Sequence, residues 1–451
     1  MVSDRYHAVV IGAGPAGETA VERLHAQGMR VAIVERELVG GECAYWACIP
    51  SKTLLRVPEV RAEADRAAGV ERPELQWPQL AAYRDYMIRD LDDTKQVTGY
   101  REEGIDVYKG EGRISGPGAV QVGETALATD RIIIATGSDP AIPSIEGLAQ
   151  AGYWTNRQAT TVAELPDSVI VLGGGPVGIE LGQFFARFGV HVTLIHTEER
   201  LIPREEPAVS ELIAQALRED GVDLRLGRSA ESVSCQGDAR RVTLSDGEEV
   251  RASELLIATG RRPRVEGLGL QTVGIKPGAR GIEVDERCRA AEGVWAIGDV
   301  TGVMPFTHVG KYQGRIVAAD IAGEEPHAGY QAIPRVVFSD PELAAVGVTE
   351  AQAREQGIEL ETARISLPET ISRPYTYERD PRGEMGLLAD RGRQVLVGAW
   401  AVAPLASEWI HQAAMAIKSE IPLAVLRDTV AQFPTFSEAY LKCVEALEPA
   451  A

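Results

Sequence analysis

The chain has 451 residues, which is too long for one hydrophobic core and predicts roughly two to four domains. Its hydrophobic content of 45% and its charged content of 25% are those of an ordinary globular protein. A net charge of −20 argues against nucleic-acid phosphates and anionic membranes as partners, and no apolar run approaches the ~20 residues of a membrane helix.

The cysteines bear on the cellular compartment. Five cysteines with a single close pair do not form a secreted disulfide framework, so we expect a reducing, cytoplasmic location. The first residues lead straight into a short strand followed by glycines, which is not the pattern of a signal peptide. Cys235, Cys288 and Cys443 stand alone, and we expect each to be a packed or exposed free thiol, with Cys443 in a structural role.

The first predicted elements form a dinucleotide-binding pattern. It consists of a strand, a Gly-x-Gly-x-x-Gly turn, a helix and a second strand, at residues 6–11, 12–17, 18–27 and 30–34. Gly12, Gly14 and Gly17 would let the backbone approach a pyrophosphate at the helix N-terminus, and Glu35 would accept hydrogen bonds from a ribose. Because strand, helix, second strand and acid occur together, the pattern predicts a functional site.

Residues 40–55 carry a close cysteine pair. Cys43 and Cys48 are separated by four residues at the expected start of a helix, with Lys52 shortly after them. A helix N-terminus and a nearby cation favour thiolate over thiol, which is typical of a redox pair. A structural disulfide, half of a zinc site and two buried thiols are the alternatives. A zinc site needs a second ligand pair at short spacing, and the sequence has none, so no metal site is expected.

A long helix is predicted over residues 77–101, because Leu80, Tyr83, Met87 and Leu91 repeat at helical spacing and would face a core. A β-patterned region follows and ends in a buried strand that closes at Ala-Thr-Gly137.

The dinucleotide pattern then recurs. A strand, a glycine turn, a helix and a second strand are expected at residues 168–172, 173–178, 179–188 and 190–195. The acid expected at the strand end is replaced by His196, with Arg200 nearby. Loss of the carboxylate removes the usual preference for a free 2′-hydroxyl, so the substitution favours NADPH over NADH.

The remaining chain adds further elements. An amphipathic helix is predicted over 208–219, and a strand over 255–260 repeats the Ala-Thr-Gly ending. A buried strand ends at Gly298-Asp299, where the Asp side chain either binds a cofactor hydroxyl or caps the next turn. Thr307 and His308 precede a helix that ends near Ala322, and Thr349 with Gln352 forms a capping box in the last region.

Together these motifs resemble the FAD-dependent pyridine nucleotide-disulfide oxidoreductases, the family of dihydrolipoamide dehydrogenase, glutathione reductase and mercuric reductase. The resemblance covers essentially the whole chain and includes Pro341-Glu342, which opens the C-terminal interface domain in this family. It implies an α/β fold with two Rossmann-like domains, for FAD and NAD(P)H, and a C-terminal α+β dimerisation domain. The implied divisions are an FAD domain in two parts at 1–143 and 265–328, an NAD(P)H domain at 144–264 and an interface domain at 329–451.

The resemblance also implies roles for single residues. Electrons from NAD(P)H would pass through FAD to a Cys43–Cys48 disulfide, with Cys48 next to the flavin and Cys43 exchanging with a small-molecule acceptor. Lys52 would pair with Glu180 beside the flavin. Members are homodimers. The cofactor-binding set comprises Lys52 and the residues Gly12, Gly14, Gly17, Glu35, Gly137, Gly173, Gly175, Gly178, His196, Gly260, Gly298, Asp299 and His308.

The C-terminal segment departs from the family. Members that reduce disulfides carry a His there, oriented by a later Glu, as the acid/base for thiol exchange. In this chain the Glu is present as Glu438, whereas the His position is Phe433. Phenylalanine transfers no proton, and losing such help typically costs about 10²–10⁴-fold in rate, so efficient dihydrolipoamide or glutathione reduction is not expected.

The cysteine loop also departs, because Tyr45 and Trp46 stand where disulfide reductases usually have slender residues. These rings either pack in the core or shape a pocket for a flat acceptor such as a quinone. Substitute acid groups on the C-terminal domain are Tyr375, Tyr377, His411 and Tyr440, with no spacing argument for any of them.

Three functions remain open. The first is a disulfide reductase whose substrate releases an acidic thiol and needs no His. The second is an NAD(P)H-dependent quinone, dye or metal-ion reductase, for which mercuric reductase is a partial precedent. The third is a flavin redox sensor or a component of a multienzyme assembly.

Overall fold

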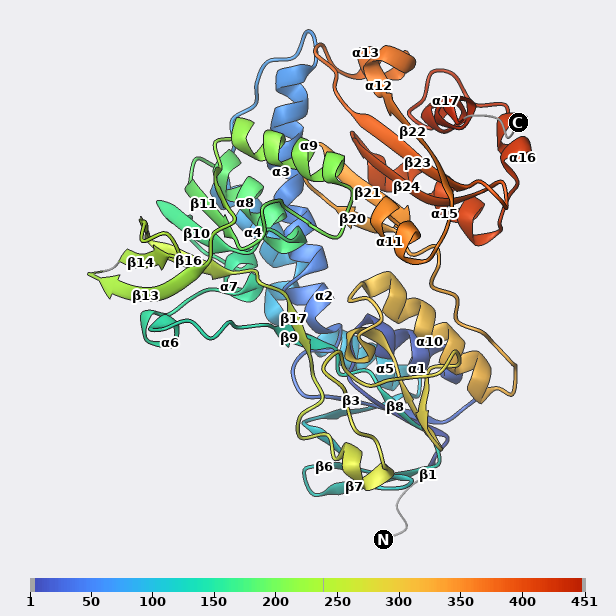
Figure 1. The fold of residues 1–451 in the computed structure, drawn as a ribbon. Coiled ribbons are helices and arrows are strands. Elements are labelled where there is room, and N and C mark those ends of the chain that lie inside the picture. Colours follow the sequence, from blue (N-terminus) through green and yellow to red (C-terminus); the bar gives the residue numbers. More distant parts are fainter. Residues whose placement is uncertain (1–4, 238, 448–451) are drawn as a thin grey trace. The chain divides into compact units, whose positions relative to one another are not determined.

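The structure is a computed structural model that describes residues 5–237 and 239–447, which fall into two units (Figure 1). The first unit contains residues 5–51, 82–141 and 260–329, and the second contains 52–81, 142–259 and 330–447. The domain boundaries expected from the sequence remain a prediction. No helix in the described residues is long and apolar enough to cross a membrane.

A six-stranded sheet is the centre of the first unit. In spatial order its strands are β18 (Arg289–Ala291), β19 (Val294–Ala296), β8 (Ile132–Ile134), β2 (Ala8–Ile11), β3 (Val31–Glu35) and β4 (Asp106–Lys109). All neighbours are parallel except β18 and β19. Val10 faces the core under the helices, whereas Val9 faces the core shared with a second sheet, so β2 is apolar on both faces.

Helices and smaller sheets complete this unit. The second sheet has the order β1 (Arg5–Tyr6), β7 (Thr125–Thr129), β6 (Ala119–Val122) and β5 (Gly112–Gly116), and β17 (Arg261–Pro263) pairs with β9 (Ser138–Pro140). The helices are α1 (Pro15–Ala26), α2 (Gly41–Tyr45), α5 (Thr94–Glu102) and α10 (Thr307–Ile321), with 3-10 turns η1 (Arg89–Leu91), η2 (Leu270–Val273) and η3 (Gly298–Thr301).

Helix α10 packs closely on α1. A Cβ at Gly310 would lie 3.0 Å from the Ala16 Cβ, and one at Gly314 would lie 2.9 Å from the Ala16 carbonyl oxygen. Glycine at these two positions therefore lets the helix backbones approach each other, and the start of α10 is held beside the start of α1.

The second unit contains a parallel and an antiparallel sheet as its main layers. The parallel sheet has the order β12 (Asp223–Leu226), β11 (His191–His196), β10 (Ser168–Leu172) and β16 (Glu254–Ile257). The antiparallel sheet has the order β20 (Arg335–Val337), β21 (Glu342–Gly347), β24 (Val395–Ala403), β23 (Glu384–Asp390) and β22 (Leu360–Ser366). A separate three-stranded sheet of β13 (Ala230–Gln236), β14 (Ala239–Leu244) and β15 (Glu249–Ala252) is formed by the chain between β12 and β16.

Short and medium-length helices connect and cover the sheets of the second unit. They are α6 (Leu148–Ala151), α7 (Asn156–Thr160), α8 (Pro176–Arg187), α9 (Pro207–Glu219), α11 (Glu350–Glu355), α12 (Leu367–Thr370), α13 (Arg373–Tyr377), α14 (Ala406–Trp409), α15 (His411–Lys418), α16 (Leu423–Arg427) and α17 (Glu438–Ala446). Helix α3 (Cys48–Arg66) begins in the first unit and continues in the second. The Thr349–Gln352 capping box at α11 is confirmed.

The single helix predicted over 77–101 is wrong. The segment forms α4 (Trp77–Met87), the turn η1 and then α5, because Arg89, Asp90 and Leu91 all adopt left-handed backbone angles, with φ of +56°, +52° and +58°. The predicted apolar stripe is also incomplete: Leu80 is buried, but Tyr83 is exposed. A smaller correction concerns Thr307 and His308, which are the first two residues of α10 rather than residues before it.

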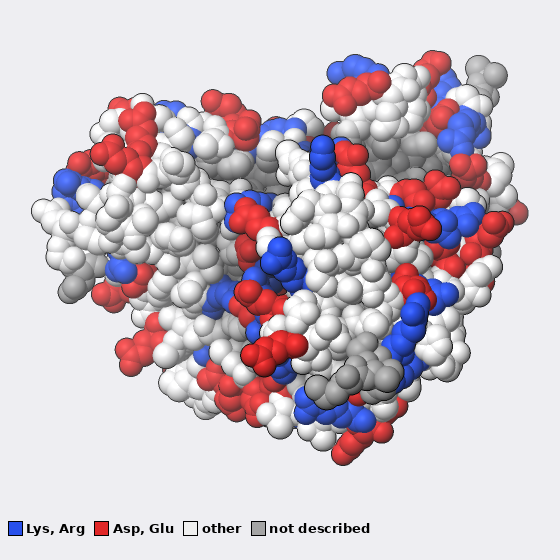
Figure 2. All heavy atoms as spheres, turned by 90° about the horizontal axis from the view of Figure 1, so that it is seen from below, with Lys and Arg blue, Asp and Glu red and all other residues white. Residues whose placement is uncertain are grey.

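Figure 2 shows one face of the described residues, on which acidic and basic side chains are interspersed. This face presents no broad basic field of the kind that phosphate backbones require, in keeping with the net charge of −20.

Candidate functional site

The turn between β2 and α1 forms a cradle with one open side. Gly12 has a φ of +109°, and a Cβ there would lie 2.3 Å from the Ala135 carbonyl oxygen. A Cβ on Gly17 would lie 2.0 Å from the Gly12 carbonyl oxygen, whereas a Cβ on Gly14 would meet nothing within 4 Å. Gly12 and Gly17 therefore hold strand and helix together, and Gly14 leaves the helix N-terminus open to a phosphate group.

Glu35 ends β3 beside this cradle and is buried. Its Oε2 accepts the Ala13 N–H and its Oε1 accepts the Glu37 N–H, both at 2.7 Å. A carboxylate has about four acceptor positions, so two fixed bonds leave capacity for ribose hydroxyls. The cradle and this acid fit the adenosine pyrophosphate part of FAD.

The turn between β10 and α8 repeats the same contacts. Gly173 has a φ of +120°, and its Cβ would lie 2.3 Å from the Ala258 carbonyl oxygen. A Cβ on Gly178 would lie 1.9 Å from the Gly173 carbonyl oxygen, and one on Gly175 would meet nothing within 4 Å. In the second cradle, as in the first, a side chain would clash at the first and third glycines but not at the second. The second cradle therefore fits a second dinucleotide.

The residue that ends the second strand differs between the two cradles. His196 ends β11, and its ring lies against Gly174, where an added Cβ would come within 2.8 Å of it. Burial lowers the pKa of His196, and its Nε2 is buried without a hydrogen-bond partner among the described residues. The ring is therefore uncharged at neutral pH.

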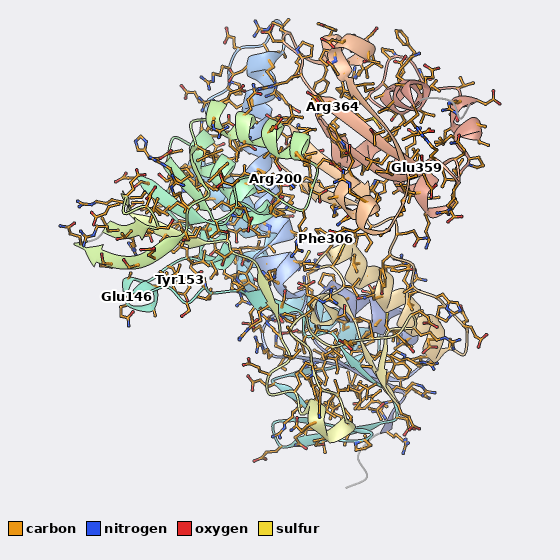
Figure 3. The ribbon with its side chains drawn as sticks, in the orientation of Figure 1. Glu146, Tyr153, Arg200, Phe306, Glu359 and Arg364 are labelled. Atoms are coloured by element: carbon orange, nitrogen blue, oxygen red, sulfur yellow. The ribbon has the colours of Figure 1, made fainter. Side chains whose placement is uncertain are left out.

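Arg200 lies in the loop after β11 (Figure 3) and donates to the carbonyl oxygens of Pro203 and Glu205, at 2.6 and 2.8 Å. The Arg200 guanidinium therefore stabilises the conformation of this loop. Preference for NADPH remains a prediction.

The two cysteines lie on neighbouring helices. Cys43 is in α2 and Cys48 is the first residue of α3, both are thiols, and both are partly exposed. The loop before them packs on the first cradle, because the Gly40 N–H donates to Ala13 at 2.8 Å and a Cβ on Gly41 would lie 2.7 Å from the Gly14 Cα. The fold therefore holds the pair beside the first cradle.

Thr307 lies between the two sulfurs. Its Oγ1 is 3.3 Å from the Cys48 Sγ and 3.4 Å from the Cys43 Sγ. The hydrogen bond with Cys48 and burial both raise the pKa of the Cys43 thiol, whereas Thr307 and Lys311 act in the opposite direction. The sequence pattern did not predict this contact, since Thr307 carries no spacing signal toward residue 43 or 48.

Tyr45 is wholly buried, and its hydroxyl donates to the Val39 carbonyl at 3.1 Å. The packing interpretation therefore holds for this ring. Trp46 is half-buried, with its ring 5.8 Å from that of Tyr45. Burial raises the pKa of Tyr440 far above its ordinary value, so this phenol is a poor substitute acid.

The remaining residues that were expected to bind a cofactor lie at the ends of strands and in α10. The Asp299 carboxylate accepts from the Ser138 hydroxyl, and the Gly298 N–H donates to the Gln313 Oε1 at 2.7 Å. The exposed His308 ring stacks on Phe306, which Figure 3 labels just before α10, with centroids 5.2 Å apart. Gly137 and Gly260, at the two Ala-Thr-Gly ends, have φ of +73° and +124° and would each carry a Cβ in open space.

Lys52 and Glu180 form an ion pair in the second unit. The Lys52 Nζ lies 2.6 Å from the Glu180 Oε2, and the Glu180 Oε1 accepts the Phe338 N–H at 3.0 Å. The ammonium also lies over the Phe338 ring, 4.7 Å from its centroid. A buried carboxylate with a charged partner and a backbone donor has a fixed position.

The C-terminal candidates are Phe433 and Glu438. Phe433 is 60% exposed, and Glu438 opens α17. The Glu438 Oε2 is buried and has no hydrogen-bond partner among the residues that the structure describes. The carboxylate expected to orient a histidine is thus present without one.

Two dinucleotide cradles and a pair of thiols define a pyridine-nucleotide-dependent oxidoreductase. Residues 6–314 match the family model described as pyridine nucleotide-disulphide oxidoreductase, and residues 333–443 match the dimerisation domain of that family. The chain belongs to this family, which is FAD-dependent and uses NAD(P)H.

Proteins similar to this chain are named for different activities. The chain is 37% identical to a mercuric reductase of Streptomyces lividans, covering 99% of this chain and 95% of that one. It is 33% identical to a dihydrolipoyl dehydrogenase of Thermus scotoductus, covering 98% and 97%. The solved Cu(II) complex of the HOCl-induced flavoprotein disulfide reductase RclA from Escherichia coli is 29% identical, with a TM-score of 0.88 and coverage of 99% and 100%.

Proposed function

We propose that this chain uses NAD(P)H to reduce a thiophilic metal ion, of the Hg(II) or Cu(II) class, at Cys43 and Cys48. The observation that carries the proposal is the partly exposed thiol pair combined with Phe433 at the usual histidine position. Soft thiolates bind soft metal ions, and a metal ion releases no thiol that needs a proton. A disulfide substrate whose leaving thiol is not acidic, in contrast, requires proton delivery to its leaving sulfur.

The ligand set is small. Among the described residues, no group of three or more His, Cys, Asp or Glu side chains is arranged to hold a metal ion. A substrate ion would therefore have two sulfur ligands, which suits an ion that must leave after reduction rather than a resident cofactor. The mercuric reductase relatives and the Cu(II) complex of a structural relative support this class of acceptor.

The electrons balance. NAD(P)H supplies two electrons and releases one proton to solvent, Hg(II) accepts two electrons to become Hg(0), and two Cu(II) ions would each accept one. Bound FAD supplies the transfer between the nicotinamide and the thiol pair. We assign FAD to Gly12, Gly14, Gly17, Glu35 and Asp299.

NAD(P)H belongs to the second cradle in this proposal, at Gly173, Gly175 and Gly178. Lys52 and Glu180 serve the flavin. A homodimer formed through residues 333–443 and a cytoplasmic location complete the proposal; light scattering of the purified protein tests the dimer.

An acceptor screen tests the function. NADPH and NADH oxidation is measured with Hg(II), Cu(II), lipoamide, glutathione disulfide and a quinone, in wild type, Cys43→Ser and Cys48→Ser. We expect the cysteine variants to lose metal-dependent oxidation by at least about 100-fold. Quinone reduction, which can take electrons directly from the flavin, should stay near the wild-type rate.

Cys235→Ser is the matched control, because Cys235 is an exposed thiol in the other unit. Metal reduction that survives in Cys43→Ser contradicts the proposal. Faster turnover of a disulfide than of either metal ion would favour a disulfide reductase instead.

A further inference from the structure

The loop after β11 returns to the second cradle and is anchored there. The Ile202 N–H donates to the Gly174 carbonyl oxygen at 3.0 Å, and the His196 ring lies against the same glycine. Ile202 has a φ of +39°, which is strained for a β-branched residue. Such a conformation persists only where the surrounding structure holds it, and it is common at ligand sites. The anchor therefore lies beside the end of β11, where a dinucleotide fold binds the adenosine ribose.

A tight turn follows this anchor. The Glu205 N–H donates to the Ile202 carbonyl oxygen at 3.0 Å, which closes a β-turn with Pro203 and Arg204 as its central residues. Proline sets the backbone angle that the first central position needs. Two residues of backbone span at most about 7 Å, so Arg204 starts close to the contact between Ile202 and Gly174.

Other charged groups of this loop already have partners. The Arg200 guanidinium donates to the carbonyl oxygens of Pro203 and Glu205, and to the Ser210 hydroxyl. The Glu205 carboxylate accepts two hydrogen bonds from Arg335, at 2.6 and 2.9 Å. Arg200 therefore supports the turn from inside the loop, and its N–H groups are not available to a ligand.

Arg204 differs from Arg200 in both respects. Its side chain is exposed, and within the part of the chain that the structure describes its guanidinium has no hydrogen-bond or ion-pair partner. Of the two acids earlier in the loop, Glu198 is exposed, and the Glu199 carboxylate lies against Gly227 after the end of β12. An unpaired guanidinium on a fixed turn suits a phosphate, which it binds through a fork of N–H groups.

We propose that Arg204 binds the 2′-phosphate of NADPH and is a specificity-determining residue of the second cradle. The two side chains at this edge would act differently: the uncharged His196 ring does not repel a phosphate, whereas Arg204 attracts it. The inference deepens the proposed function, because it rests on the assignment of NAD(P)H to the second cradle. Arg200 is nearer to the strand end in sequence, but its guanidinium is committed to the loop itself.

Two nucleotide fragments without nicotinamide test this assignment on the FAD-loaded enzyme. ADP-ribose and its 2′-phosphorylated form differ only in the group that Arg204 would bind, and isothermal titration gives both dissociation constants. We expect the wild type to bind the phosphorylated form at least about tenfold more tightly. Arg204→Gln should weaken binding of that form by about 10–100-fold, the effect of hydrogen bonds to a charged group, and should bind ADP-ribose within about twofold of wild type.

Arg218→Gln is the matched control. Arg218 is an exposed arginine of α9 without a side-chain partner among the described residues, and it lies about 16 Å along the helix from the start of α9. Its replacement removes the same charge from the same unit, so both dissociation constants should stay within about twofold of wild type. Arg204→Lys keeps the charge without the planar fork and should lose less than about fivefold. Added salt should reduce the wild-type preference, because an exposed charge pair is screened.

The inference is overturned if Arg204→Gln keeps the wild-type preference, or if it weakens binding of both fragments equally, as a purely structural residue would. A wild-type enzyme that binds both fragments equally also overturns it, while the second cradle stands as the nucleotide site. Binding of neither fragment would refute that site as well. No metal ion takes part in these titrations, so their outcome is independent of the acceptor screen.

Discussion

Lys52 and Glu180 should differ in how much each contributes to stability, because they differ in burial. The Glu180 side chain is 7% exposed, and the Lys52 side chain is 37% exposed, although their charged atoms are 2.6 Å apart. Lys52→Met leaves the Glu180 carboxylate buried beside the Phe338 N–H, and stranding a buried charge costs about 3 kcal/mol or more. Glu180→Gln leaves an ammonium that water reaches, so it should cost only about 1 kcal/mol.

Thermal unfolding of the FAD-loaded enzyme measures this asymmetry. For a unit of this size, each kcal/mol of lost unfolding free energy lowers the melting temperature by about 2–4 °C. Lys52→Met should therefore lower the melting temperature by about 6–12 °C and Glu180→Gln by about 2–4 °C. The double variant should be more stable than Lys52→Met alone, since removing the carboxylate removes the stranded charge. Equal losses in the two single variants, or a larger loss in Glu180→Gln, would refute the reasoning from burial.

Substitutions at three other positions give independent tests. His196→Glu should lower kcat/KM for NADPH at least about tenfold relative to NADH, because a carboxylate there binds a ribose hydroxyl and repels a 2′-phosphate; equal losses for both nucleotides would contradict the assignment. Burial raises the pKa of Glu342 from 4.5 to about 7, so the folded state holds a proton that the unfolded chain has lost, and stability falls as the pH rises through this range. Glu342→Gln keeps an acceptor for the Ser407 N–H, which lies 2.7 Å from the carboxylate, and should therefore raise the unfolding free energy at pH 8 by up to about 3 kcal/mol, with little change at pH 4; denaturation at both values checks this. Phe433→His, placed near the unpartnered Glu438 in sequence, should gain measurable reduction of lipoamide or glutathione disulfide, and Phe433→Leu, assayed in parallel by NADH oxidation, should not.

The elements around both cradles could be predicted closely from the sequence. The strand over residues 168–172 was predicted with the bounds that β10 has, and the strand–glycine–helix order of the first cradle matches β2 and α1. These segments combine buried apolar strands with glycines whose positions the local geometry requires, so local and tertiary signals agree.

The failed helix at residues 77–101 shows where local signals mislead. Helical spacing of apolar residues predicted continuity, but the three left-handed residues of η1 interrupt it. Such a conformation costs free energy in non-glycine residues, and tertiary contacts must stabilise it. Arg89, the first of the three, lies within 3.5 Å of the buried Tyr45 hydroxyl, a contact between segments 44 residues apart that no local pattern encodes.

The Thr307 contact was missed for the same kind of reason. The residue follows Cys43 by 264 positions in sequence, and it reaches the sulfurs only because α10 is held against α1. A threonine at a helix start predicts a cap by itself. Its position between two sulfurs depends on glycines in the middle of α10, whose role becomes visible only when both helices are placed.

The two cradles within this chain provide an internal comparison of how cofactor choice arises. Their glycine contacts agree closely: 2.3 Å at Gly12 and Gly173, and 2.0 and 1.9 Å at Gly17 and Gly178. Turn geometry therefore leaves the same open helix N-terminus for a pyrophosphate in both cradles and offers no basis for discriminating between nucleotides. We expect discrimination to come from the residue that ends the second strand. This residue is a buried carboxylate in one cradle and an uncharged histidine ring in the other, so His196 is the first position at which to alter nucleotide preference.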